Sequence, residues 1–198
     1  MADTSLGVAR SEFILGGQKS GKSRRAEALA HQWLTASSEH HAVLIATAQP
    51  WDSEMEARIA RHQADRAERV PGMRTVEEPL ALTQTLRQYS TPQTLVVVDC
   101  LTLWLTNCLM PMTEVKASNG ALAQPCPAQA AMLLEAISTA PGPVVIVGNE
   151  IGLGVIPMGR EVRSFVDALG RLNQEVAGTC ARVTLMVAGV PLTLKGGA

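Results

Sequence analysis

The stretch Gly16-Gly17-Gln18-Lys19-Ser20-Gly21-Lys22-Ser23 decides the fold class of this chain. It matches G-x-x-x-x-G-K-[ST], a pattern that forms a phosphate-binding loop when it follows a strand and opens a helix. The residues before it, 13–15, are all apolar and are predicted to form a buried strand. A helix is predicted to begin at Lys22, because apolar residues recur with helical spacing at Ala26, Leu29, Ala30, Trp33 and Leu34. Both structural requirements of the motif are therefore met.

The residue types in this loop suit a bound nucleoside triphosphate. Glycines let the backbone curl so that its amides face inward, and the helix N-terminus adds the positive end of its dipole. We expect Lys22 to pair with the β- and γ-phosphates. We expect Ser23 and Asp99, which follows an apolar strand, to hold Mg²⁺. A simple glycine-rich turn is the alternative, but it does not explain why strand, helix and carboxylate occur together.

The rest of the chain predicts an α/β fold with a mostly parallel central sheet flanked by helices. Short runs of Val, Ile and Leu without alternation are typical of strands that are buried on both faces. These runs lie at 42–46, 95–98, 144–147 and 183–187, with an edge strand predicted at 192–195. Helices are predicted at 52–66, with Asp52 as N-cap, and at 160–177, with an apolar stripe that includes Val162. Residues 111–127, with three prolines, are predicted to be a loop.

The length, charge and cysteine content of the chain make several classes of protein a poor fit, so they are not expected. The length suits one domain, 1–198, with a flexible N-terminus over 1–11. Because 17 Lys and Arg face 18 Asp and Glu, nucleic acid is not an expected partner. No export signal or membrane span is predicted. The four cysteines form no C-x-x-C pair and are expected to be reduced and buried, so we expect a cytoplasmic protein.

A histidine flanked by two arginines marks the helix predicted at 52–66. Arg58, His62 and Arg66 are spaced by four and therefore share one ridge, which suits phosphate. Flanking cations disfavour a protonated imidazole, and a neutral imidazole can attack phosphorus. The alternatives are a solvated charged face, or a histidine packed beside Met55 and Ile59. Spacing alone favours these structural alternatives.

A second polar segment follows the strand at 144–147. Residues 149–154 read Asn-Glu-Ile-Gly-Leu-Gly and lie at the carboxyl edge of the predicted sheet, where open α/β sheets bind ligands. They are predicted to form a wall of the site. An ordinary strand-to-helix loop is the equally supported alternative.

Several longer strings in the sequence are typical of one enzyme family. They are G-G-x-x-S-G-K-S at 16–23, A-T-A at 46–48, D-x-E-M-x-x-R-I-x-x-H at 52–62, T-x-E-E-P at 75–79, D-C-L-T-x-W-x-x-N at 99–107, N-E-I-G-x-G-x-x-P at 149–157 and R-x-x-R-x-F-x-D-x-x-G-x-x-N-Q at 160–174. On these strings the chain resembles the bifunctional adenosylcobinamide kinases/adenosylcobinamide-phosphate guanylyltransferases of cobalamin biosynthesis. It departs from their pattern at 67–73, and Lys19 stands where the loop often has Arg.

The resemblance implies a RecA-like P-loop NTPase fold and two reactions at one nucleotide site. Adenosylcobinamide would be phosphorylated with ATP or GTP, and GMP from GTP would then pass to adenosylcobinamide phosphate through a guanylyl-histidine at His62. It also implies Mg²⁺ and a homo-oligomer, a trimer in the family. The catalytic residues would be His62, Lys22, Arg58 and Arg66. The nucleotide-binding positions would be Gly16, Gly17, Gln18, Lys19, Ser20, Gly21, Lys22, Ser23, Thr47, Ala48, Gln49, Gln63, Ala64, Asp65, Arg66, Glu77 and Asp99.

Two other functions fit the phosphate loop. The first is a P-loop kinase of another small molecule, in which His62 is structural and no nucleotide becomes attached to the protein. The second is a nucleotide-dependent switch or assembly protein, whose slow hydrolysis would not respond to cobinamide.

Overall fold

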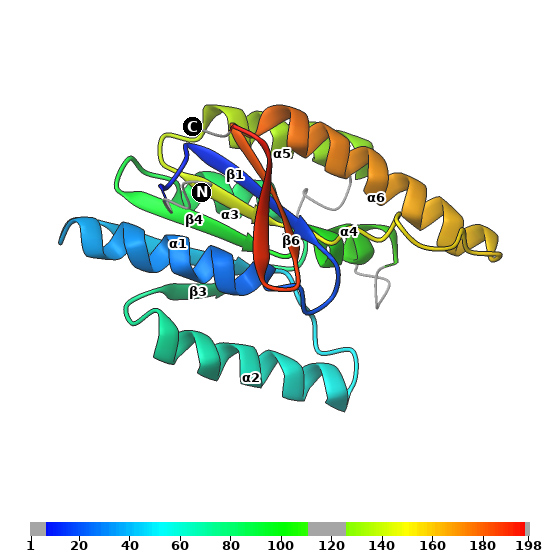
Figure 1. The fold of residues 1–198 in the computed structure, drawn as a ribbon, viewed down its shortest axis with the longest axis horizontal. Coiled ribbons are helices and arrows are strands. Elements are labelled where there is room, and N and C mark those ends of the chain that lie inside the picture. The colour runs from blue at the N-terminus through cyan, green and yellow to red at the C-terminus, as the bar shows by residue number, and fades with distance from the viewer. Residues whose placement is uncertain (1–6, 111–125, 197–198) are drawn as a thin grey trace.

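A computed structural model describes residues 7–110 and 126–196 (Figure 1). Its centre is one seven-stranded sheet in the order β3-β2-β4-β5-β1-β6-β7. All neighbouring strands are parallel except β6 and β7, which are antiparallel. The strands are β1 (Ser11–Gly16), β2 (His41–Ala46), β3 (Arg74–Glu77), β4 (Thr94–Asp99), β5 (Val144–Val147), β6 (Arg182–Val187) and β7 (Val190–Lys195).

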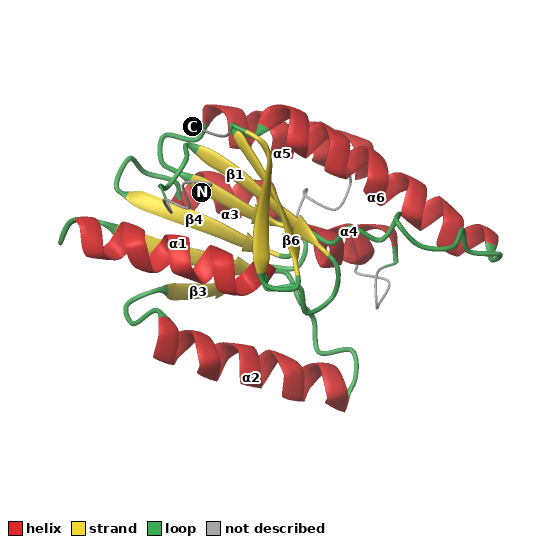
Figure 2. Ribbon diagram, viewed as in Figure 1, coloured by secondary structure: helices red, strands yellow, loops and turns green. Residues whose placement is uncertain are grey.

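Helices cover both faces of the sheet (Figure 2). They are α1 (Lys22–Ala36), α2 (Ser53–Arg69), α3 (Leu82–Tyr89), α4 (Leu101–Leu109), α5 (Cys126–Thr139) and α6 (Arg160–Thr179). Alternate residues of one strand enter different cores, as β1 illustrates. Phe13 and Leu15 pack with residues of α3 to α6, whereas Ile14 packs with α1 and with Val70, just after α2. Because both faces are covered, the strands need continuous apolar runs.

The α/β P-loop fold with a mostly parallel sheet is confirmed. The strands predicted from apolar runs are all present, and the edge strand begins two residues earlier than predicted, at Val190. Strand β3 and helices α3 to α5 were not located from the sequence. The predicted loop at 111–127 is wrong at its end, because α5 begins at Cys126; residues 111–125 lie outside the described residues. The predicted stripe on α6 is also too long, since Val162 is 52% exposed.

The N-terminal segment becomes regular earlier than predicted. Residues 1–6 lie outside the described residues, but Ser11 is buried and belongs to β1, and the Arg10 carbonyl accepts a hydrogen bond from the Val144 amide. The expected flexible segment 1–11 therefore extends too far.

All four cysteines are free; Cys100 and Cys180 are buried, and Cys108 and Cys126 are half-buried. No helix in the described ranges is long and apolar enough to cross a bilayer.

The strand register brings several predicted site residues to one edge. Glu77 pairs with Ala46, Ala46 pairs with Asp99, and Asp99 pairs with Val147. Four parallel strands, β3, β2, β4 and β5, therefore end in line, and the loops that follow them emerge together. Ligands of open α/β sheets bind at this carboxyl edge.

Candidate functional site

The phosphate loop has the predicted strand–loop–helix geometry. Gly16 closes β1 at φ 153°, and a Cβ there would lie 2.5 Å from both the Met186 carbonyl oxygen and Ser20 Oγ. Gly21, at φ 101°, is the N-cap of α1. No side chain caps this helix and its first turn has no acidic residue. Its first amides are therefore available to an anion, and the helix dipole favours one there.

Lys22 lies over the loop. Its Nζ donates to the Gly17 carbonyl oxygen at 2.6 Å, and the residue is buried. Burial lowers the pKa of Lys22; Arg58 lowers it further, whereas Cys100 and Asp99 raise it. Arg58 of α2 therefore lies near enough to Lys22 for its charge to act on that lysine.

Ser23 and Asp99 are brought together from distant parts of the chain. Ser23 Oγ donates to Asp99 Oδ2 at 2.9 Å, which joins the first turn of α1 to the end of β4. Strand β5 separates β4 from β1 in the sheet, yet the two oxygens still converge beside the phosphate loop. A hydroxyl and a carboxylate are the hard oxygen donors that Mg²⁺ prefers.

Thr47, which is predicted to contact the nucleotide, has a side chain that bonds to the protein backbone. It is fully buried. Its Oγ1 donates to the Cys100 carbonyl oxygen at 2.7 Å and accepts from the Cys100 amide at 2.9 Å. Both hydrogen-bonding functions of the hydroxyl are therefore used on the backbone next to Asp99. The hydroxyl of Thr47 thus positions the backbone next to Asp99. Ala48 and Gln49, which follow it, are half-buried.

We expect Thr47→Val to destabilise the fold by about 1–3 kcal/mol, because the Cys100 amide loses its buried partner. Chemical denaturation measures this loss. Thr47→Ser keeps the hydroxyl and is the matched control, which we expect to remain closer to the unsubstituted protein. Equal stability of the valine variant and the unsubstituted protein would contradict the positioning role.

Helix α4 ties the loops at this edge together. Asn107 Nδ2 donates to the carbonyl oxygens of Thr47 and Pro79, at 2.8 and 3.1 Å. Thr102 Oγ1 accepts from the Asn149 amide, and Trp104 Nε1 donates to the Leu80 carbonyl oxygen. Thr102, Trp104 and Asn107 thus hydrogen-bond to the loops that follow β2, β3 and β5. No role was predicted from the sequence for Thr102, Trp104 or Asn107; the signal was polar residues within an otherwise apolar helix.

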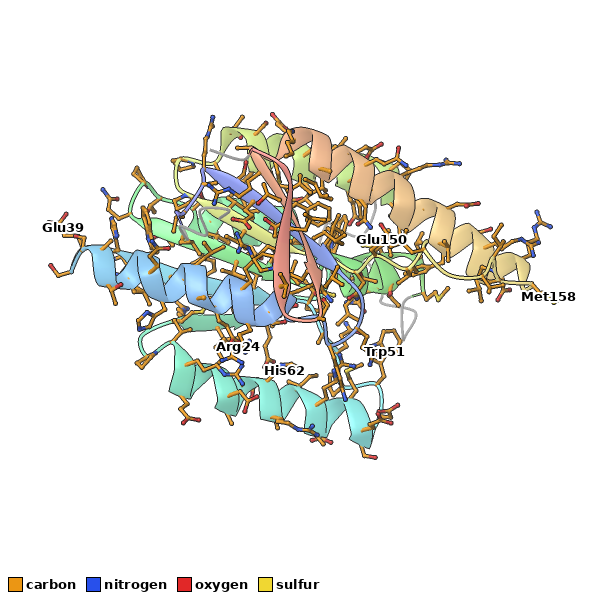
Figure 3. The ribbon with its side chains drawn as sticks, viewed as in Figure 1. Arg24, Glu39, Trp51, His62, Glu150 and Met158 are labelled. Atoms are coloured by element: carbon orange, nitrogen blue, oxygen red, sulfur yellow. The ribbon has the colours of Figure 1, made fainter. Side chains whose placement is uncertain are left out.

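The predicted ridge of arginines and histidine lies on α2. Asp52 is the N-cap as predicted, accepting from the Met55 amide at 2.8 Å. His62 is exposed, and Figure 3 shows it on the side of α2 that faces α1. Arg66 is buried, and its guanidinium makes no hydrogen bond or ion pair to any residue in the described ranges. A cation without a counter-charge on the protein is suited to a bound anion.

The neighbouring predicted nucleotide contacts pair among themselves. Gln63 Nε2 donates to Glu77 Oε1 at 2.9 Å, linking α2 to the end of β3. Asp65 accepts from Arg69 at 3.2 Å, one turn along the helix, and Ala64 is exposed. The structure therefore brings together Gln63 and Glu77. It also brings together Ser23 of the phosphate loop and Asp99 at the end of β4.

The segment after β5 begins beside the phosphate loop. The Glu150 amide donates to the Gly16 carbonyl oxygen at 3.2 Å, and Asn173 Nδ2 of α6 donates to the Asn149 carbonyl oxygen at 3.1 Å. Asn149 and Glu150 thus lie at the carboxyl edge of the sheet, as predicted, with Glu150 bonded to the start of the phosphate loop. Beyond Gly152, the segment continues to Met158 at the far end of the molecule (Figure 3).

Comparison with known proteins agrees with this geometry. A sequence model of the family described as cobinamide kinase / cobinamide phosphate guanyltransferase matches residues 12–194. The chain belongs to this family. The bifunctional adenosylcobalamin biosynthesis protein CobP of Pseudomonas aeruginosa is 46% identical over 93% of this chain and 97% of its own length. The corresponding CobU proteins of Escherichia coli and Salmonella typhimurium are 35% and 32% identical, each over 92% of this chain and 98% of their own length.

Membership of the cobinamide kinase / cobinamide phosphate guanyltransferase family decides between the functions left open by the sequence. The protein is a bifunctional enzyme of cobalamin biosynthesis that acts as a kinase and as a guanylyltransferase. A kinase of an unrelated small molecule and a switch protein are no longer needed to explain the phosphate loop.

Proposed function

We propose that this enzyme transfers GMP through a covalent guanylyl-histidine at His62. The observation that carries the proposal is the position of the α2 ridge. Arg58 acts electrostatically on Lys22 of the phosphate loop, and His62 follows one turn later on the same helix. Figure 3 shows His62 on the side of α2 that faces α1, the helix that begins at the phosphate loop. A kinase alone requires no such nucleophile.

Guanylyl transfer would take two displacements at the α-phosphorus. A nitrogen of His62 attacks the α-phosphorus of GTP, a P–N bond forms, and the bond to the β-phosphate oxygen breaks. Pyrophosphate leaves with the electron pair, and the other ring nitrogen releases its proton. A phosphate oxygen of adenosylcobinamide phosphate then attacks the same phosphorus, and the P–N bond breaks to restore the imidazole. Arg58 and Arg66 would stabilise the negative charge that develops on the phosphorus oxygens.

For the kinase reaction, we propose that the same loop holds ATP or GTP while a hydroxyl of adenosylcobinamide attacks the γ-phosphorus. Lys22 would balance charge on the β- and γ-phosphates. Ser23 and Asp99 fit Mg²⁺, because their oxygens converge and Mg²⁺ bound to nucleotides needs few protein ligands besides the phosphates. Bound Mg²⁺ would neutralise phosphate charge.

Pyrophosphate exchange tests the covalent route. If His62 is guanylylated before the corrinoid reacts, labelled pyrophosphate enters GTP in the absence of any corrinoid. Direct transfer to adenosylcobinamide phosphate gives exchange only when the corrinoid is present. Exchange that requires the corrinoid would therefore contradict the proposal, while leaving the guanylyltransferase activity itself in place.

We further propose that the chain forms a homo-oligomer, with the trimer as the form implied by the resemblance. Figure 1 shows the start of α6 and the preceding segment reaching beyond the sheet. This projection is rich in exposed apolar side chains, with Leu153 84%, Val155 97% and Met158 95% exposed. Strand β7 adds an exposed apolar edge at Val190, Leu192 and Leu194. Exposed apolar surface of this kind is typical of protein interfaces.

We expect Val155→Asp to lower the oligomeric state, because a buried charge at an interface is costly to desolvate. Light scattering coupled to size-exclusion chromatography measures the mass. Glu161→Asp, at the start of α6, keeps the surface charge and is the matched control. A monomeric unsubstituted protein would contradict the proposal.

We also propose a cytoplasmic location, which suits the four free thiols.

A further inference from the structure

A buried carboxylate on the phosphate-loop helix has no role in the chemistry described above. Glu27 is only 4% exposed. It lies four residues after Ser23, so the two share one ridge of α1. Its Oε2 accepts from Arg69 Nη1 at 3.1 Å, and across the described ranges no other side chain pairs with it. A buried carboxylate with a single partner depends strongly on that partner, because an unpaired buried charge is very costly.

The partner, Arg69, is the last residue of α2, the helix that carries His62. Apart from Arg66, the residues of this helix are not buried, so few apolar contacts hold it to the sheet. Two side-chain hydrogen bonds join α2 to other elements within the part of the chain that the structure describes. One is Gln63 to Glu77 and the other is Arg69 to Glu27. Both lie in the half of α2 that follows His62, and only the second reaches the helix that carries Lys22.

Arg69 lies where α2 gives way to β3, in the stretch 67–73. In the structure, this stretch completes α2 and then turns at Gly72, φ 91°, into β3. Arg69 also donates to Asp65 at 3.2 Å, so its guanidinium is held from its own helix as well. Asp65 therefore holds the Arg69 guanidinium where it pairs with Glu27.

We propose that Glu27 is a positioning residue for guanylyl transfer: through Arg69 it fixes α2 against α1 and holds His62 toward the phosphate loop. This inference rests on the proposed role of His62 as the nucleophile. Phosphorylation of the corrinoid uses Lys22, Ser23 and Asp99, none of which lies on α2. Loss of the Glu27–Arg69 pair therefore slows the first half of guanylyl transfer and spares the kinase reaction.

The test compares two rates in the full-length enzyme carrying Glu27→Gln. The first is single-turnover attachment of label from GTP labelled at the α-phosphate, and the second is phosphorylation of adenosylcobinamide. We expect labelling to slow roughly 10-fold to 100-fold, since misplacement of a reacting group by about 1 Å has effects of this size. The phosphorylation rate stays close to that of the unsubstituted enzyme. Glu135→Gln, which breaks the exposed pair with Arg87, is the matched control and changes neither rate.

Arg69 provides a second route to the same answer if the glutamine variant folds poorly. Arg69 is 45% exposed, so the Arg69→Gln variant is expected to fold. It should slow labelling as Glu27→Gln does and leave the kinase rate unchanged. Arg69→Lys retains the cation and should restore most of the labelling rate. The double variant Glu27→Gln/Arg69→Gln is no slower than the single variants, because one interaction is removed. Unchanged labelling in these variants overturns the inference, as does an equal loss of both activities. If the unsubstituted enzyme takes up no label, the guanylyl-histidine itself is wrong.

Discussion

His62→Ala is expected to abolish guanylyl transfer while phosphorylation of adenosylcobinamide continues. In the proposed route, the imidazole forms the only bond that links the nucleotide to the protein. Loss of an essential nucleophile lowers a rate by about 10³-fold or more. The kinase reaction keeps Lys22, Ser23 and Asp99, so its rate should change little. Both rates are measured on one preparation, by following adenosylcobinamide phosphate and adenosylcobinamide-GDP separately.

His31→Ala is the control for this experiment, because His31 is an exposed histidine on α1 and does not belong to the ridge of α2. It should leave both rates unchanged. Persistent formation of adenosylcobinamide-GDP by His62→Ala would remove the histidine from the mechanism. The enzyme would then transfer GMP directly from GTP to the corrinoid phosphate.

Lys22→Ala is expected to lower both activities by about 100-fold or more, because both reactions use the same triphosphate site. The side chain is already buried, and its ammonium group donates to the Gly17 carbonyl oxygen of the phosphate loop. Equilibrium binding of GTP should weaken in parallel. A variant that lost only one of the two activities would show that the reactions use separate nucleotide sites.

The pKa of Lys22 gives this prediction a pH dependence. Burial lowers that pKa below 10.5, so the free enzyme loses the ammonium charge at a lower pH than an exposed lysine would. A triphosphate prefers the protonated form. Binding of GTP should therefore weaken on the alkaline side before pH 10.5 is reached, whereas Lys22→Arg, weaker at neutral pH, should show no such decline. Titration calorimetry over this range measures the difference.

The sequence predicted most reliably the elements that have strong local signals. The apolar runs located the strands β1, β2, β4, β5 and β6, because strands buried on both faces need continuous apolar side chains. The phosphate loop was recognisable because its glycines meet backbone requirements, as the positive φ values of Gly16 and Gly21 confirm. Strand β3 has no such signal. It is short, includes Arg74 and Glu77, and is only half-buried.

The parts of the site that depend on long-range contacts were not accessible to sequence reasoning. Thr47 belongs to the A-T-A string at 46–48, which the resemblance relates to nucleotide binding. Its hydroxyl nevertheless donates a hydrogen bond to the Cys100 carbonyl oxygen, fifty-three residues away. The pairing of Ser23 with Asp99 was foreseeable only because strand-end carboxylates commonly complete such sites. The pairing of Glu27 with Arg69 had no signal at all, since either residue alone resembles an ordinary surface charge of a helix.

One measurement tests the central claim most directly. The purified enzyme is incubated with Mg²⁺ and GTP labelled at the α-phosphate, then denatured and tested for label that remains on the protein. A guanylyl-histidine predicts bound label that acid removes and alkali spares, that is absent in His62→Ala, and that adenosylcobinamide phosphate discharges from the native enzyme. No bound label, under conditions where GTP demonstrably binds, would contradict the histidine mechanism.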